Sequence, residues 1–215
     1  MTTGQSQYRA VIFDLGGVVF PSPFDAFDVY DEQNGLTVGT TRALIRTSSE
    51  TGAWAALERN EITIAEFATA LQTEAAGEGF VLDAHVLLQT ISGGFGARPA
   101  MLAAIRSIRA HGLATAALTN NWAAPNGERD DNGRFGALDF DVVVESSIEG
   151  LRKPDPRIYH LVLDRLAVRA DETVFLDDLG INLKPARAIG MTTIKVVDPP
   201  TALRELEAVL GFPLT

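Results

Sequence analysis

Short, continuous apolar runs recur along this chain, and segments with helical character separate most of them. The runs lie at residues 8–14, 113–119, 141–145, 173–178 and 191–197. Strands buried on both faces form such unbroken runs, whereas strands with one wet face alternate apolar and polar residues. Strands of this kind that alternate with helices build a parallel sheet covered on both sides. We therefore predict an α/β fold with a Rossmann-like, three-layer core.

One long segment interrupts this alternation. From Phe24 to about Ile91 every stretch resembles helix, with a serine or threonine start signal in TSSETGAW, and the glycine-rich SGGFGARP follows. Helices alone form a small bundle, and we expect Trp54, at helical spacing from Leu57, in its core. The predicted division is a core of residues 1–20 and 97–215, with an α-helical cap of residues 21–96 inserted after the first strand.

Composition narrows the classes of function. The 215 residues suffice for one domain with a large core and an inserted subdomain. The absence of cysteine excludes disulfides, thiolate zinc sites and cysteine nucleophiles. A formal net charge of −10 argues against a nucleic-acid partner, because clustered Lys and Arg bind phosphate backbones. A small phosphorylated substrate stays compatible, since a metal ion and one lysine make a local site positive.

The sequence also bears on location. No apolar run approaches the roughly 18 residues that a membrane span requires. The N-terminal MTTGQSQYR is polar and lacks the basic and apolar pattern of a signal peptide. We expect a soluble, cytoplasmic protein without a membrane partner, and a monomer and a homodimer are both compatible with the sequence.

The first polar motif, FDLGGV, places Asp14 at the end of the first run and two glycines soon after it. A carboxylate here can attack phosphorus and form an aspartyl phosphate, which divides a difficult displacement into two easier ones. The glycines allow a tight turn in which successive N–H groups, at Leu15 and Gly16, face phosphate oxygens. A simple turn aspartate is the alternative interpretation of this motif.

The second motif, TNNW, follows the second run. Thr119 and Asn120 offer a hydroxyl and an amide to a phosphoryl oxygen, with Asn121 as a further candidate, and a turn or helix cap is the alternative. Trp122 is expected either to flank the substrate or to pack in the interior. In the third motif, KPDP, the ammonium of Lys153 can neutralise a phosphate, or it can be a surface lysine before a helix that begins at a proline.

The fourth motif, LDDLG, carries two adjacent acids at the end of an apolar strand. Asp177 and Asp178 repel one another unless a cation is present. Oxygen-rich sites with one or two carboxylates suit Mg²⁺. Asn182, four residues on, is expected to orient this loop. Because the carboxyl ends of parallel strands meet at one edge, all four motifs are predicted to converge there.

Together these motifs resemble the four motifs of the haloacid dehalogenase (HAD) superfamily, and the helical insertion resembles its C1-type cap. Within that superfamily, VIFDLGGVVFPSP, LTNNW and FLDDLGINLKPARAIGM are similar to the HAD domains of multidomain acyl-CoA dehydrogenase family proteins and to the phosphatase domain of soluble epoxide hydrolase. The resemblance implies a Mg²⁺-dependent phosphatase with a small phosphorylated substrate. The roles that it implies are Asp14 as nucleophile and metal ligand, the Gly16 carbonyl and Asp178 as metal ligands, Asp177 as their support, Thr119 and Asn120 as phosphate ligands, and Lys153 as the neutralising cation.

The sequence departs from the superfamily's pattern at Gly16. Typical members have there an aspartate that protonates the leaving group and activates water. A glycine keeps the metal-binding carbonyl and loses the acid–base group, a loss that costs about 10²–10⁴-fold in rate. Good leaving groups, such as acyl phosphates or sugar 1-phosphates, reduce this penalty. A cap side chain such as Asp25, Asp28 or Asp31 is an alternative proton source.

Two other functions compete with the phosphatase. A metal-independent 2-haloacid dehalogenase uses an aspartate to attack carbon and needs no acid for the departing halide, which fits Gly16. The adjacent Asp177 and Asp178 argue against it, because such an enzyme needs no metal site. A catalytically impaired HAD domain that binds a ligand or protein is the third hypothesis, and the presence of Asp14, Lys153 and Asp178 argues against it.

Overall fold

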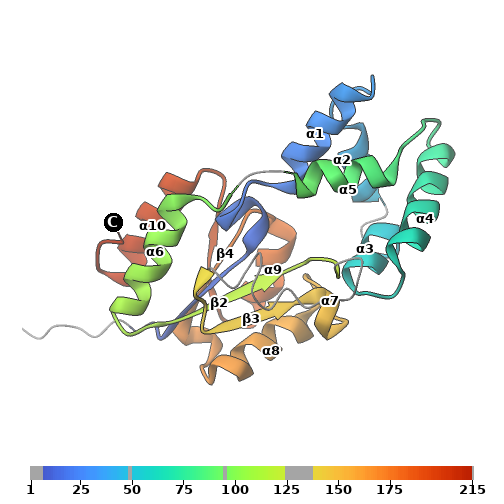
Figure 1. The fold of residues 1–215 in the computed structure, drawn as a ribbon. Helices are drawn as coiled ribbons and strands as arrows, with labels where there is room; N and C mark the ends of the chain where they lie inside the picture. Colours follow the sequence, from blue (N-terminus) through green and yellow to red (C-terminus); the bar gives the residue numbers. More distant parts are fainter. Residues whose placement is uncertain (1–6, 48–49, 94–95, 124–137, 215) are drawn as a thin grey trace, which may run out of the picture.

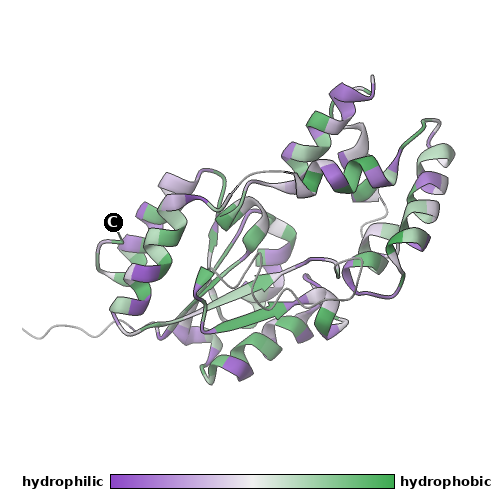
Figure 2. Cartoon of the chain, in the orientation of Figure 1, coloured by the Kyte–Doolittle hydropathy of each residue, from purple (hydrophilic) through white to green (hydrophobic). Residues whose placement is uncertain are grey.

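The structure, a computed structural model, describes residues 7–47, 50–93, 96–123 and 138–214. The described residues form a five-stranded sheet of order β3-β2-β1-β4-β5, in which every neighbouring pair is parallel. Its strands are β1 (Ala10–Phe13), β2 (Ala114–Thr119), β3 (Val142–Glu145), β4 (Thr173–Asp177) and β5 (Thr192–Lys195). Each lies within a predicted apolar run. The hydropathy colouring shows these strands as mostly apolar (Figure 2).

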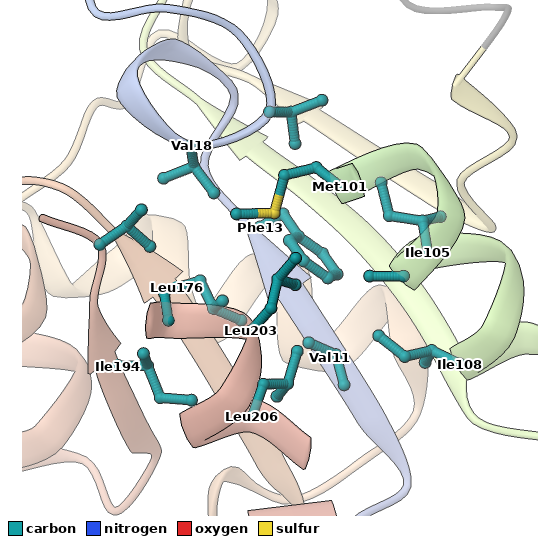
Figure 3. Packing of buried hydrophobic residues seen from close by; sticks show 14 of the residues in the cluster. Val11, Phe13, Val18, Met101, Ile105, Ile108, Leu176, Ile194, Leu203 and Leu206 are labelled. Carbon is teal, nitrogen blue, oxygen red and sulfur yellow. The ribbon is translucent and has the colours of Figure 1, made fainter. Parts of the chain in front are cut away.

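Helices cover both faces of the sheet, which confirms the predicted three-layer α/β core (Figure 1). One face carries α6 (Pro99–Ala110) and α10 (Pro199–Leu210), where Phe13 lies among Met101, Ile105 and Leu203 (Figure 3). The other carries α8 (Pro156–Leu166) and α9 (Gly180–Ala188), where Ile12 packs in one cluster with Val162. The short elements of the core are η1 (Leu15–Val19), α7 (Ser146–Glu149) and η3 (Ala170–Glu172).

The strand order reverses direction at β1. From β1 the chain adds β2 and β3 on one side and later β4 and β5 on the other. Ligands of such sheets bind beyond the carboxyl ends of the strands that flank this switch point. Here those strands are β1 and β4, which lead into Asp14 and Asp178.

Five helices between η1 and α6 form a group that we call the helical unit, at the upper right of Figure 1. They are α1 (Pro23–Gln33), α2 (Thr40–Thr47), α3 (Ala53–Glu58), α4 (Ile64–Gly77) and α5 (Ala84–Ser92). They enclose a cluster of their own, in which Trp54 and Leu57 are buried as predicted. Ser22 caps α1 with Pro23 in its first turn, and Thr63 with Glu66 forms a capping box at α4.

Two local differences separate this structure from the sequence-based predictions. Asp14 follows β1 instead of ending it, because its side chain caps η1. The helix expected in TSSETGAW begins only at Ala53, as α3, with Gly52 and not a serine or threonine at its N-cap, and a separate helix, α2, ends at Thr47. The start of the N-terminal tail, part of the predicted start signal at residues 48–49 and part of the glycine-rich return at residues 94–95 lie outside the described residues.

Over the described residues, no helix combines the length and the apolar character that crossing a bilayer requires.

Candidate active site

Asp14 lies directly beyond β1, at the switch point of the sheet. Its main-chain N–H donates to the carbonyl of Leu176 in β4 over 2.8 Å, which continues the parallel ladder by one residue. Its Oδ1 accepts the N–H of Leu15 at 2.7 Å. Among the described residues, no hydrogen bond to Oδ2 is present, so this oxygen remains available for attack or for a metal.

Lys153 connects the ends of the two strands. Its side chain is 1% exposed, and Nζ lies 2.8 Å from both Asp14 Oδ1 and Asp177 Oδ2. Because an ammonium carries three donors, one more remains for a phosphoryl oxygen. The structure thus places the lysine of KPDP in the interior beside the predicted nucleophile, and not on the surface.

Asp177 binds both Lys153 and the loop that follows β4. It is completely buried, and its Oδ1 accepts from the Leu179 N–H at 2.8 Å and from Asn182 Nδ2 at 3.1 Å. Its Oδ2 accepts from Asn182 Nδ2 and from Lys153 Nζ. With both oxygens engaged, Asp177 holds the lysine and the loop together. The carbonyl of Asn182 in turn accepts from the Tyr159 hydroxyl at 2.7 Å.

Asp178 is held far more loosely. Its Oδ2 has the Ser22 hydroxyl at 3.4 Å, from the segment that leads into α1. On its other side lies Gly17, whose φ is +77° and whose Cα would carry a Cβ only 2.2 Å from Asp178 Oδ2. Only glycine satisfies both the backbone angle and this close approach. The second glycine of FDLGGV therefore makes room for the carboxylate of LDDLG.

The electrostatics of the cluster follow from burial and mutual repulsion. Burial raises the pKa of Asp14 well above its ordinary value; Lys153 opposes this rise, and Asp177 and Asp178 add to it. Burial, and then the charge of Asp177, raises the pKa of Asp178 to about 6. Burial acts to lower the pKa of Lys153, but the carboxylates of Asp14 and Asp177 outweigh it, so the pKa is raised. The Lys153 ammonium is therefore charged, and its single positive charge does not balance the three carboxylates.

These residues fit a divalent cation. Asp14, Asp177 and Asp178, which we call the acidic cluster, each offer an oxygen within 4.8 Å of the others. Three carboxylates face one ammonium, which leaves up to two negative charges uncompensated. Since the oxygens of Asp177 are engaged, Asp14 and Asp178 are the carboxylates that would hold the ion. An all-oxygen donor set of this kind suits Mg²⁺.

The backbone angles at Gly16 do not require a glycine, but a neighbouring side chain restricts the space for any other residue. Its φ of −66° and ψ of 131° suit any residue. A Cβ on Gly16, however, would lie 3.2 Å from Cδ of Pro23, the first residue of α1. Helix α1 thus begins against the position where a typical HAD phosphatase has its acid.

The residues of TNNW make different contacts. Thr119 ends β2 and is buried, with Oγ1 3.5 Å from the carbonyl of Asn120. Asn120 binds the Lys153 main chain: Oδ1 accepts its N–H at 2.9 Å, and Nδ2 donates to its carbonyl at 3.0 Å. The Asn121 side chain contacts Glu145 and Ser147. Their predicted phosphate contacts stay predictions, and these amide contacts supply another role for both asparagines.

Three further side chains lie beside the site: Trp122, predicted to flank the substrate or to pack in the interior, and Glu58 and Ser22, which carried no prediction. Trp122 packs against the cluster of the helical unit, edge-on to Trp54 at 5.7 Å. Glu58, from α3, pairs with Arg152 next to Lys153. The Ser22 hydroxyl donates to Asp178, and its position before a proline at a helix start is the one sequence signal that could have indicated it. Nothing in the sequence singles out Glu58, because Arg152, its partner in the core, is distant along the chain.

Comparison with known proteins agrees with this geometry. The sequence model of the haloacid dehalogenase-like hydrolase family matches residues 8–190. The chain is 45% identical to mouse acyl-CoA dehydrogenase family member 10 over 99% of its own length and 20% of the relative's. It is 35% identical to pig bifunctional epoxide hydrolase 2, over 96% of its own length and 39% of the relative's. It therefore spans less than half the length of these relatives.

A third relative has nearly the same length as this chain. The sesquiterpene phosphatase astK of Aspergillus oryzae is 30% identical over 95% of this chain and 97% of its own. Solved structures share the fold. A HAD family enzyme of Bacteroides thetaiotaomicron, in complex with magnesium and inorganic phosphate, superposes with a TM-score of 0.60 at 20% identity, over 87% of this chain and 93% of its own. The L-2-haloacid dehalogenase of Xanthobacter autotrophicus superposes with a TM-score of 0.62 at 19% identity, over 94% of this chain and 82% of its own.

Proposed function

Because the chain belongs to the haloacid dehalogenase-like hydrolases, we propose that it is a Mg²⁺-dependent phosphatase that acts on a small phosphorylated compound. The observation that carries this proposal is the acidic cluster, in which the Lys153 ammonium pairs with Asp14 and Asp177, and Asp14 and Asp178 keep unengaged oxygens. Relatives support it, since astK is named a phosphatase and the Bacteroides enzyme holds magnesium and phosphate.

The chemistry follows from the placement of Asp14. Oδ2 of Asp14 attacks phosphorus as the bond to the leaving oxygen breaks, and the leaving group takes the electron pair and then a proton. Water next attacks the phosphorus of the aspartyl phosphate, which releases inorganic phosphate and the free carboxylate. Lys153 fixes Oδ1, so that Oδ2 is the attacking atom, and its charge offsets that of the phosphoryl oxygens. Asp14 and Asp178, with the Gly16 carbonyl that the resemblance implies as a third ligand, would hold a Mg²⁺ ion, which would supply further positive charge.

Gly16 determines which phosphates we expect to react fastest. It provides no side chain to protonate the leaving group, so substrates whose leaving group departs as a stable anion are favoured. We expect acyl phosphates to react faster than aryl phosphates, and aryl faster than alkyl phosphates. Since a relative carries the name sesquiterpene phosphatase, a prenyl phosphate belongs in the same comparison.

The test is a phosphate-release assay with acetyl phosphate, glucose 1-phosphate, p-nitrophenyl phosphate, glycerol 3-phosphate and farnesyl phosphate. We expect turnover that needs Mg²⁺, stops with EDTA, and falls by about 10⁴-fold or more in Asp14→Asn. Asp171→Asn, an exposed acid paired with Arg169, is the matched control and should keep full activity. Absence of Mg²⁺-dependent release from every compound would refute the proposal.

A haloacid dehalogenase is the second candidate, and the observation that favours it is Gly16, since a departing halide needs no proton. Its expected signature is halide release from 2-chloropropionate that persists with EDTA. The acidic cluster favours the phosphatase, because a metal-free reaction has no use for the partly buried carboxylate of Asp178 beside Asp177.

A further inference from the structure

An ion pair joins the helical unit to the core beside Lys153. Glu58, the last residue of α3, is 6% exposed, and its Oε2 lies 2.7 Å from Nε of Arg152. Arg152 directly precedes Lys153 in the chain. Buried pairs add little net stability, yet they impose a defined geometry on the groups that they join. The pair therefore fixes the segment that carries the lysine.

The Glu58 carboxylate is itself held in place from within the helical unit. Its Oε1 accepts the indole N–H of Trp54 at 2.9 Å, one helical turn earlier. Trp54 is 7% exposed and meets the ring of Trp122, which follows TNN in the core. One oxygen is thus fixed by the helical unit, and the other points to the core.

On the core side, the same oxygen reaches a second group that holds Lys153. Asn120 Nδ2 lies 3.4 Å from Glu58 Oε2 and also donates to the Lys153 carbonyl at 3.0 Å. Asn120 Oδ1 accepts the Lys153 N–H. Glu58 therefore contacts both the residue before Lys153 and the amide that binds its main chain on both sides.

We propose that Glu58 is a positioning residue, which holds Arg152 and Asn120 and through them the main chain from which Lys153 reaches Asp14 and Asp177. The lysine is then aligned with the nucleophile only while the helical unit is seated on the core. The importance of this alignment for turnover rests on the proposed phosphatase function, whereas the alignment itself does not.

Amide hydrogen exchange, measured by NMR, tests the alignment without any substrate. Glu58→Gln keeps the shape of the side chain and an acceptor for Trp54 but removes the charge. The Lys153 amide should exchange about tenfold faster, as expected from weakening one charge-assisted hydrogen bond. Glu61→Gln, which removes the same charge from an exposed pair with Arg59 just beyond α3, should leave it unchanged. Equal Lys153 exchange in the two variants would overturn the proposal.

A double variant tests whether Glu58 acts through Arg152. In an Arg152→Gln background, Glu58→Gln should change Lys153 exchange much less than it does alone, because the two residues act as a unit. Independent, additive effects would show that Glu58 does not act through Arg152. A merely structural loss of the helical unit would instead speed the exchange of the Leu71 amide in α4, which should keep its protection in Glu58→Gln.

Turnover of p-nitrophenyl phosphate with Mg²⁺ gives the functional measurement. Glu58→Gln should lower kcat by about tenfold with KM changed by less than about twofold, as expected when alignment and not binding is lost. An unchanged kcat would overturn the role in turnover. If the unaltered protein hydrolyses none of the five test phosphates, the proposed function fails, while Lys153 exchange still decides the positioning role.

Discussion

The acidic cluster and the helical unit beside it are stabilised in opposite ways. The acidic cluster buries charge. Its Asp14 and Asp177, together with Lys153, which pairs with both, are at most 7% exposed, and their charges offset one another. The helical unit buries rings, with Trp54 edge-on to Phe27 and Phe67. Buried charge is costly unless it is paired, whereas buried rings are favourable without a partner. The acidic cluster should therefore respond to pH and metal, and the apolar core of the helical unit to neither.

Lys153→Met should give the largest effect on stability. It leaves the carboxylates of Asp14 and Asp177 without their cation, which should lower the free energy of unfolding by about 5 kcal/mol at pH 8. Because Lys153 opposes the rise in the pKa of Asp14, its loss should make Asp14 bind a proton still more tightly in the folded than in the unfolded state. Stability from such groups is present below the unfolded pKa and is lost as pH rises through the folded one. The deficit should thus shrink toward pH 5, as measured by urea unfolding with EDTA.

Leu71→Ala is the matching change in the helical unit. Leu71 is fully buried in the apolar cluster, and its truncation should cost about 3 kcal/mol. No titratable group is altered, so the cost should be the same at pH 5 and pH 8. A Lys153→Met deficit as flat as that of Leu71→Ala would show that the acidic cluster is not electrostatically coupled.

The sequence predicts the two regions to different degrees. The apolar runs predicted the parallel sheet. The convergence of Asp14, Lys153 and Asp178 could be predicted from it, because the carboxyl ends of parallel strands meet at one edge. The roles of Gly17 and Asn120 were not predictable, since each depends on a contact with a residue distant in sequence. Glu58 and Arg152 share this limit. Periodicity reports burial along one element and carries no information about which element lies opposite.

Asp178→Asn should reverse the usual outcome of mutating a site residue. Burial raises the pKa of Asp178 from 3.8 to about 6, so its charge destabilises the metal-free protein above that pH. A shift of two units corresponds to at most about 3 kcal/mol. With EDTA, the variant should be about 2 kcal/mol more stable than the unaltered protein at pH 8, with no gain at pH 4.

The response to Mg²⁺ shows whether Asp178 is a ligand of the ion or only an unfavourable charge. The ion should raise the melting temperature of the unaltered protein at pH 8, because it binds the folded state, and should not raise that of Asp178→Asn. Asp171→Asn should keep the full response to Mg²⁺. An equal response in all three proteins would mean that the ion binds elsewhere.

Gly16→Asp should give the smallest effect on stability, and it probes the contact between the two regions. The new Cβ would lie 3.2 Å from Pro23 Cδ at the start of α1, while the backbone at Gly16 accepts any residue. Overpacking of this kind should cost about 1–2 kcal/mol. Pro23→Ala removes the obstructing ring, so the double variant should recover most of that loss. No recovery would mean that the added carboxylate, and not its Cβ, causes the strain.

The same pair of variants tests what Gly16 does in catalysis. If the missing acid limits turnover of alkyl phosphates, the double variant should hydrolyse glycerol 3-phosphate faster than the unaltered protein does, by about tenfold or more. Gly16→Asp alone should gain less, because Pro23 restricts where its carboxylate can point. Acetyl phosphate, whose leaving group needs little protonation, should show no gain with either variant. A gain for both substrates would assign the effect to charge at the site and not to proton transfer.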